Sequence, residues 1–105
     1  MVRGDIHALR LPRGRGHAQH GRRYGVIVQA DDLLALSTIV ICPTSRSALP
    51  ASFHPEITVE DQTTRVLCEM LGAVDSRVLG KPSGHLTVAE MHAVDEALLL
   101  TLDLS

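Results

Sequence analysis

The chain has 105 residues, which predicts a single domain with one modest hydrophobic core. Hydrophobic residues make up 45% of the sequence, which excludes a disordered chain, and no apolar run is long enough to predict a membrane span. The formal net charge of −2 argues against a general polyanion binder, and the only aromatic residues, Tyr24 and Phe53, are too few for a base-stacking sheet.

The charged residues are unevenly distributed along the chain. Six arginines lie before residue 24, against the single acid Asp5, whereas residues 87–105 carry four acids and no lysine or arginine. This asymmetry predicts a local site for an anionic partner, although a solvated arginine-rich loop would have the same composition. The six arginines are Arg3, Arg10, Arg13, Arg15, Arg22 and Arg23.

The first third of the chain predicts two strands joined by a polar loop. Residues 5–11 are expected to form the first strand, and residues 12–21, rich in glycine, arginine and histidine, the loop. Residues 24–29 predict the second strand because their β-branched run suits the interior of a sheet. Residues 30–36 are expected to form a turn or a single helical turn.

The third predicted strand, residues 38–42, is fully apolar and therefore central in the sheet. Pro43 is expected to end its pairing, so that the hydroxyl groups of Thr44 and Ser45 emerge at the end of the strand. A loop is expected to follow over residues 46–52.

The second half of the chain continues the sheet. Residues 54–59 predict an edge-like strand, residues 64–71 another strand, and residues 72–80 a turn. Cys42 and Cys68 lie in strand-like apolar runs and are interpreted as buried free thiols, with a disulfide between neighbouring strands as the alternative. No secretory signal precedes the chain, which predicts a cytoplasmic protein.

The C-terminal segment predicts one helix, from about residue 88 to residue 102. Thr87 and Glu90 have the spacing of a capping box, in which each side chain bonds the backbone of the other residue. Apolar residues then recur at helical spacing, at Val88, Met91, Val94, Leu98 and Leu102. The elements together predict a mainly β fold, with a mostly antiparallel sheet closed by a C-terminal α-helix.

The histidines outside the arginine-rich loop predict no site of their own. His54 and His85 flank strands without an evident partner, and His92 is expected to be solvated on the polar side of the helix. A zinc site built from His17 and His20 with the two cysteines is conceivable, but no closely spaced cysteine pair supports it.

Four segments of the chain together resemble the MazF/PemK family of bacterial toxins. They are "RGDIH" at residues 3–7, where the family usually ends the motif in tryptophan, "GHAQHGRRY" at 16–24, "PTS" at 43–45, and residues 79–104 with their "VDEAL" string. The resemblance extends over nearly the whole chain and implies a single toxin domain over residues 1–105.

This resemblance implies a small SH3-like, CcdB-like β-barrel with a C-terminal helix. It also implies a homodimer, a cognate antitoxin as partner, and cleavage of single-stranded RNA by a metal-independent endoribonuclease that needs no cofactor. In such a reaction the ribose 2′-hydroxyl is the nucleophile, so the protein must supply a base, an acid and a cation for the phosphate.

The resemblance assigns catalytic roles to five residues. Arg23 matches the arginine that precedes the second strand and would hold the phosphate. Either Thr44 or Ser45 matches the threonine whose hydroxyl would bond the scissile phosphate, because a one-residue slip around Pro43 leaves the register open. His17 and Glu69 stand where relatives have further catalytic side chains.

RNA contacts are expected from the arginine-rich segment before the second strand and from Arg46, the first residue of the loop predicted over residues 46–52. These RNA-binding candidates are Arg13, Arg15, Gln19, His20, Arg22 and Arg46. An acidic, partly disordered antitoxin tail is expected to cover the same basic loop, because RNA and an acidic peptide would seek the same charges.

Some positions depart from the family pattern. Residues 69–73 read "EMLGA" where relatives have "DQIRT", Leu67 replaces an arginine, and Ala18 replaces a loop glutamate. These changes remove polar groups that would contact RNA, so a base preference does not transfer. They leave a second hypothesis open, in which a catalytically weak or silent relative acts by binding a protein, either the antitoxin or another target such as gyrase.

Overall fold

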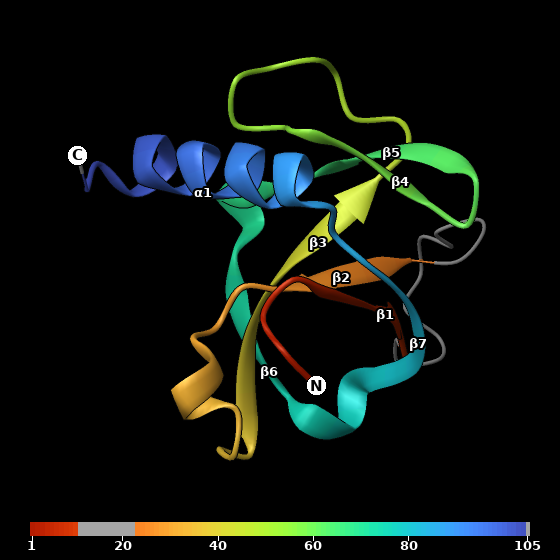
Figure 1. The fold of residues 1–105 in the computed structure, drawn as a ribbon, viewed down its shortest axis with the longest axis vertical. Helices are drawn as coiled ribbons and strands as arrows, with labels where there is room; N and C mark the ends of the chain where they lie inside the picture. Colours follow the sequence, from red (N-terminus) through yellow and green to blue (C-terminus); the bar gives the residue numbers. More distant parts are fainter. Residues whose placement is uncertain (11–22, 105) are drawn as a thin grey trace, which may run out of the picture.

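The computed structural model describes residues 1–10 and 23–104, and confirms a mainly β fold with a C-terminal helix (Figure 1). The strands are β1 (Asp5–Leu9), β2 (Tyr24–Ile27), β3 (Thr38–Ser45), β4 (Glu56–Val59), β5 (Gln62–Val66), β6 (Gly72–Asp75) and β7 (Leu79–His85). The helix is α1 (Val88–Leu102), and three 3-10 turns are η1 (Asp31–Leu33), η2 (Cys68–Met70) and η3 (Ser76–Val78). No helix in this part of the chain is long and apolar enough to cross a membrane.

The strands pair antiparallel in the order β4-β5-β3-β2-β1-β7, and β6 pairs with β3 as well. The central strand β3 has two partners on one side. Residues 38–41 pair with β6, whereas Thr44 and Ser45 pair with β5. This change of partner lets the sheet curl into a half-barrel, with α1 lying across one side of it (Figure 1).

Pro43 does not end the third strand, contrary to the prediction. β3 continues to Ser45, and the carbonyl of Pro43 accepts a hydrogen bond from the Leu67 amide at 2.8 Å. The N–H and C=O of one strand residue point to the same side, so an N–H on residue 43 would also face the Leu67 side. On that side β5 has already ended and the chain turns into η2, so no neighbouring strand needs a hydrogen bond from residue 43.

The predicted turn over residues 72–80 is also wrong. Residues 72–75 form β6, residues 76–78 form η3, and β7 starts at Leu79. The sequence "LGKPSGH" of β7 has two glycines and a proline, which is typical of a loop. An outer strand tolerates proline, and β7 pairs with β1 through two irregularities in register.

The core is divided between the two faces of β2 and β3. On the side covered by α1, Val26 and Cys42 pack with Val94 and other buried side chains, whereas Ile27 and Ile41 belong to a cluster on the opposite face. Both faces of these strands are therefore buried, which explains the uninterrupted apolar runs. Each fully buried Val or Ile contributes about 1.5–3 kcal/mol relative to an exposed one.

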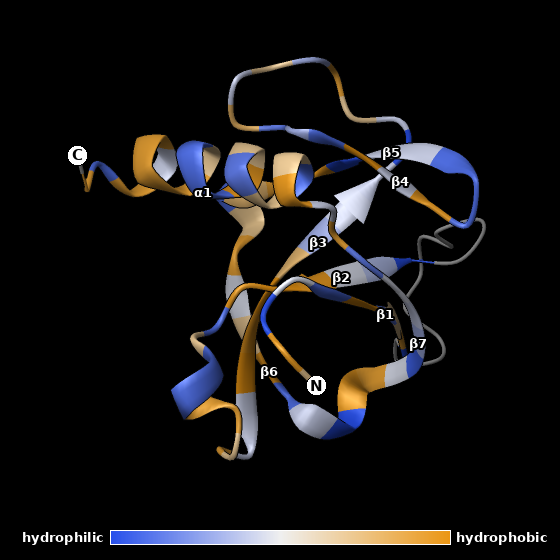
Figure 2. Cartoon of the chain, in the orientation of Figure 1, coloured by the Kyte–Doolittle hydropathy of each residue, from blue (hydrophilic) through white to orange (hydrophobic). Residues whose placement is uncertain are grey.

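The helix begins with the predicted capping box. The Thr87 hydroxyl accepts from the Glu90 amide at 3.1 Å, and one Glu90 carboxylate oxygen accepts from the Thr87 amide at 2.9 Å. The other oxygen accepts from the Thr58 amide of β4 at 2.9 Å, so one side chain both caps α1 and attaches it to the sheet. Polar and apolar residues alternate around α1 (Figure 2).

The two cysteines are buried and not joined by a disulfide, as predicted. Cys42 lies in β3 and Cys68 in η2, and both belong to the cluster beneath α1. The neighbouring Cys68 thiol, and then burial, raise the pKa of the Cys42 thiol, so Cys42 is uncharged and acts as a small apolar side chain.

Candidate functional site

The starting end of β2 and the finishing end of β3 lie next to each other. Gly25 pairs with Pro43, and continuing this register by two residues places Arg23 opposite Ser45. Arg23 is half-buried, and its carbonyl accepts from the Leu9 amide of β1 at 2.9 Å. A Cβ on Gly25 would lie 2.8 Å from the side chain of Ile41 in β3, so this glycine leaves room for the Ile41 side chain beneath the candidate site.

Thr44 and Ser45 point to opposite faces of the sheet. Thr44 is only 3% exposed, and its hydroxyl donates to the Tyr24 carbonyl at 3.2 Å on the side of α1. Ser45 is half-buried on the other face, where its hydroxyl lies 3.1 Å from that of Ser47. The alternation of side chains along β2 also directs Arg23 to the face of Ser45. In this structure Ser45 is the hydroxyl on the arginine's side.

The tip of the β4–β5 hairpin borders the same end of the sheet. The Tyr24 hydroxyl donates to the Glu60 carboxylate at 2.6 Å, and Arg46 is hydrogen-bonded to Gln62. Glu60 and Asp61 have φ angles of 50° and 66°, which form a tight turn without glycine. The sequence carries no hairpin signal such as Asn-Gly, so this acidic tip was not predicted.

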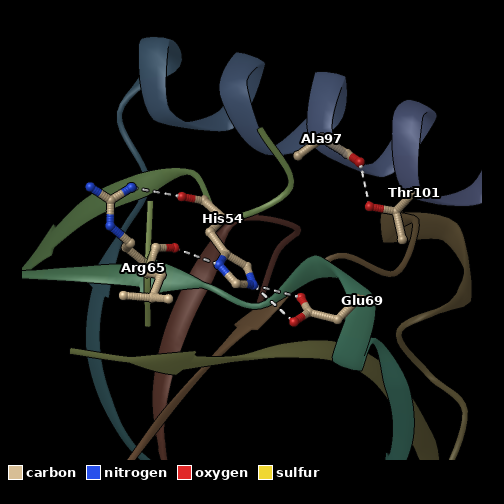
Figure 3. Close-up of polar contacts among 6 residues, drawn as sticks. His54, Arg65, Glu69, Ala97 and Thr101 are labelled. Atoms are coloured by element: carbon tan, nitrogen blue, oxygen red, sulfur yellow. Dashed lines mark hydrogen bonds and ion pairs between the residues drawn. The ribbon is translucent and has the colours of Figure 1, made fainter. Parts of the chain in front are cut away.

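Glu69 lies on η2 and not at the paired ends of β2 and β3 that carry Arg23 and Ser45. It is exposed on η2, beneath the C-terminal half of α1, beside a shallow apolar hollow lined by Phe53, Leu100 and Thr101. Figure 3 shows its carboxylate pointing to His54. A single chain thus brings Arg23 and Ser45 together but does not place Glu69 with them.

The prediction that His54 lacks a partner is wrong. Its Nε2 lies 2.8 Å and 3.0 Å from the two Glu69 oxygens (Figure 3). Its Nδ1 lies 2.8 Å from the Leu49 carbonyl oxygen. Because both ring nitrogens face acceptors, the doubly protonated ring satisfies both contacts. The bonds to Glu69 and to the Leu49 carbonyl raise the pKa of His54. Desolvation raises the pKa of Glu69, but the bond and charge of His54 and a backbone hydrogen bond together lower it below its usual value.

His85 also has a partner, contrary to the prediction. Its Nδ1 lies 2.7 Å from an Asp5 carboxylate oxygen at the end of β1 that is remote from Arg23. His92, by contrast, is exposed on α1 as predicted, with Glu96 3.8 Å away. Histidines at strand ends were not paired from the sequence because their partners lie 15 and 80 residues away.

Six of the predicted site residues fall in the segment 11–22, outside the described residues. They are Arg13, Arg15, His17, Gln19, His20 and Arg22. Among residues 1–10 and 23–104, no three His, Cys, Asp or Glu side chains gather in a group that could hold a metal ion.

The same chain matches known proteins along its length. A family model described as "PemK-like, MazF-like toxin of type II toxin-antitoxin system" matches residues 2–102. A toxin candidate of Mycobacterium tuberculosis, Rv3098A, is 36% identical over 106 residues, covering 99% of each chain. The M. tuberculosis endoribonuclease MazF9 is 30% identical over 115 residues, covering 99% of this chain and 98% of its own.

A solved structure shares the fold. An endoribonuclease from Mycobacterial species, solved in complex with its cognate antitoxin, superposes with a TM-score of 0.83 at 19% identity, covering 100% of this chain and 97% of that chain. The half-barrel with a C-terminal helix is therefore the architecture of this endoribonuclease too. Because the family model and the two mycobacterial relatives match nearly the whole chain, this chain belongs to the PemK-like, MazF-like toxins of type II toxin–antitoxin systems.

Proposed function

We propose that this toxin cleaves single-stranded RNA without a metal ion, through attack of a ribose 2′-hydroxyl on the adjacent phosphate. The observation that carries the proposal is the placement of Arg23 and Ser45 on one face of neighbouring strands. A guanidinium and a hydroxyl so placed can both donate to one phosphate. The relative MazF9, named as an endoribonuclease, supports the same activity.

The proposed reaction divides its work among a few side chains. The 2′-oxygen loses its proton to a base and bonds to phosphorus, while the 5′-oxygen leaves with a proton from an acid, giving a 2′,3′-cyclic phosphate. Arg23 would stabilise the charge that builds on the phosphate oxygens, and Ser45 or Thr44 would donate to one of them. His17 and Glu69 remain the candidates for the two proton transfers.

The proposed partners are a cognate antitoxin and a second copy of the chain, acting in the cytoplasm where RNA is available. The fold neighbour solved with its antitoxin supports the first. In a homodimer, two arginine-bearing edges would border one RNA groove. A second copy also offers a route by which Glu69 of one chain could reach the RNA bound by Arg23 of the other.

A second candidate function is a silent toxin that acts by binding a protein. The exposed apolar side chains near η2 and the end of α1 favour it, with Leu49 77%, Met70 59%, Leu100 56% and Leu104 67% exposed. Such side chains suit a protein interface better than an RNA groove.

The test is a cleavage assay on a long unstructured RNA with EDTA present. We expect wild-type protein to cleave, and Arg23→Ala to lose about 10²- to 10³-fold in rate, the usual cost of removing one transition-state donor. Arg77→Ala, which removes a distant exposed arginine on η3, is the matched control and should cleave normally. Wild-type protein that leaves RNA intact, or cleaves only when metal is restored, would contradict the proposal.

A further inference from the structure

Arg65 of β5 lies in line with Arg23 and Ser45. Ser45 pairs with Arg65 in the β3–β5 ladder, and Glu56 pairs with Arg65 in the β4–β5 ladder. Paired residues of antiparallel strands point to the same face. With Arg23 opposite Ser45, the side chains of Arg23, Ser45, Arg65 and Glu56 follow one another across the sheet, on the face away from α1. The first three, Arg23, Ser45 and Arg65, form the arginine row.

The geometry of the row fits a chain of phosphates. Neighbouring strands are about 4.8 Å apart, so the backbones at Arg23 and Arg65 are separated by about 10 Å, with Ser45 between them. Two long cationic side chains at that separation can each hold a different phosphate of one extended strand. Arg46, the residue that follows β3, adds a further positive charge to this end of the sheet.

Arg65 is oriented but not fully occupied by the contacts described. One guanidinium nitrogen donates to the His54 carbonyl at 3.0 Å (Figure 3), and another lies 3.2 Å from a Glu56 oxygen. A guanidinium has five N–H donors, and these contacts use two of them. The Glu56 side chain is 58% exposed and that of Arg65 is 23% exposed, so the carboxylate is the solvated partner of the pair and a phosphate can replace it.

We propose that Arg65 is a second phosphate-binding residue of this toxin, holding a backbone phosphate of single-stranded RNA next to the one held by Arg23 and Ser45. The inference rests on the proposed function and extends it to a residue that the family resemblance does not mark. Glu56 then acts as a resident competitor, because its carboxylate occupies the guanidinium while RNA is absent.

The test measures binding of a single-stranded 2′-O-methyl RNA of mixed sequence, which cannot be cleaved because its 2′-hydroxyls are blocked. We expect Arg65→Gln to weaken binding about three- to tenfold and to reduce the slope of log affinity against log salt by about 0.7, the value for one phosphate of a single strand. Arg65→Lys should keep most of that slope. Glu56→Gln should strengthen binding about twofold, since it removes the competing carboxylate.

The matched control is Arg77→Gln. It removes the same charge from η3, beside the opposite end of β3, where screening should hold its effect below about twofold. Equal losses in Arg65→Gln and Arg77→Gln would overturn the inference. So would a Glu56→Gln variant that binds more weakly, because the Glu56–Arg65 pair would then only support the hairpin.

The design separates this inference from the function on which it rests. If wild-type protein cleaves RNA in EDTA but the Arg65 and Glu56 variants bind like the control, only the role of Arg65 fails. If wild-type protein neither cleaves nor binds RNA, the proposed function fails and the role of Arg65 falls with it. If Arg65→Gln does not fold, Glu56→Gln still decides the question by strengthening or weakening binding, and Arg65→Lys should keep most of the salt slope.

Discussion

Arg3, just before β1, and Arg65, in β5, have similarly covered side chains, 29% and 23% exposed, yet their contacts differ. Arg3 contacts four residues in three other segments. Its amide donates to Asp31 at 2.6 Å, and its guanidinium contacts the Val28 carbonyl, the Met91 sulfur and the Asp95 carboxylate at 2.8, 3.8 and 2.9 Å. It therefore links the N-terminus to η1, to the residue that follows β2, and to α1. Arg65 has one backbone acceptor and one solvated carboxylate. The first arrangement holds the fold together, whereas the second leaves donors for a ligand.

This difference shows why counting arginines misjudges a binding site. The six arginines before residue 24 suggested one basic site, but Arg3 is committed to the structure at the far end of β1. Arg65, which lies outside that segment in the sequence, joins the face of Arg23 instead. The partners of each guanidinium, and not its position in the sequence, separate the two kinds of arginine.

The largest effect expected from this comparison is on stability. Arg3→Ala removes a half-buried guanidinium and leaves Asp95 without its cation, so the free energy of unfolding should fall by about 1.5–3 kcal/mol. RNA cleavage per folded molecule should not change. Chemical denaturation and the EDTA cleavage assay measure the two quantities on one preparation. A fully folded Arg3→Ala protein that no longer cleaves would place Arg3 in the site after all.

A smaller effect should separate Thr44 from Ser45. Thr44→Val removes a buried hydroxyl and leaves the Tyr24 carbonyl without that donor, so we expect about 1 kcal/mol lower stability. Ser45→Ala should leave stability unchanged and slow cleavage about tenfold, since it removes one hydrogen bond to the phosphate. The reverse outcome, with cleavage lost in Thr44→Val and retained in Ser45→Ala, would assign the catalytic hydroxyl to Thr44.

The smallest effect concerns pH and the pair formed by His54 and Glu69. The raised pKa of His54 means that its contribution is complete below about pH 6.5 and is lost as pH rises through the folded-state pKa. The lowered pKa of Glu69 means that its contribution is present above about pH 4.3 and is lost as pH falls. Stability should therefore gain about 0.5 kcal/mol between these values, a small amount because Glu69 is solvated.

His54→Gln is the variant that checks this pH dependence. Denaturant unfolding from pH 4 to pH 9 should show the gain in wild-type protein and its absence in the variant. An identical pH profile in both proteins would mean that the pair contributes nothing and that other groups set the pH dependence. His92→Gln, on the exposed side of α1, is the control that should match wild type.

The sequence predicted those parts of the fold whose signals are local. The β-branched run in β2, the apolar run in β3, and Thr87 with Glu90 at the start of α1 each depend on neighbours a few residues away. The strands β6 and β7 were missed because glycine and proline hide their pattern and their partners are distant in sequence. The hairpin tip at Glu60 was missed because no glycine marks it.

The candidate site likewise has a part that local sequence signals predict and a part that depends on distant pairings. The sequence predicted that Arg23 lies near Thr44 and Ser45, because the first residue of one strand and the last residue of its antiparallel neighbour lie at the same end of the sheet. Which hydroxyl shares the face of the arginine depended on where β3 ends, and this required knowing that Pro43 continues the strand. The role of Arg65 depends on the β3–β5 register, which no sequence pattern specifies.

The second bond of Glu90 has a consequence for how the protein avoids aggregation. In the described sheet β4 is an outer strand, and an outer strand with open N–H groups is a template for adding a strand from another molecule. The carboxylate of Glu90 covers the outward amide of Thr58, and at the other margin Pro82 of β7 has no amide proton to offer. The Glu90 side chain that caps α1 therefore also blocks one backbone position at which a strand of another molecule could add to β4.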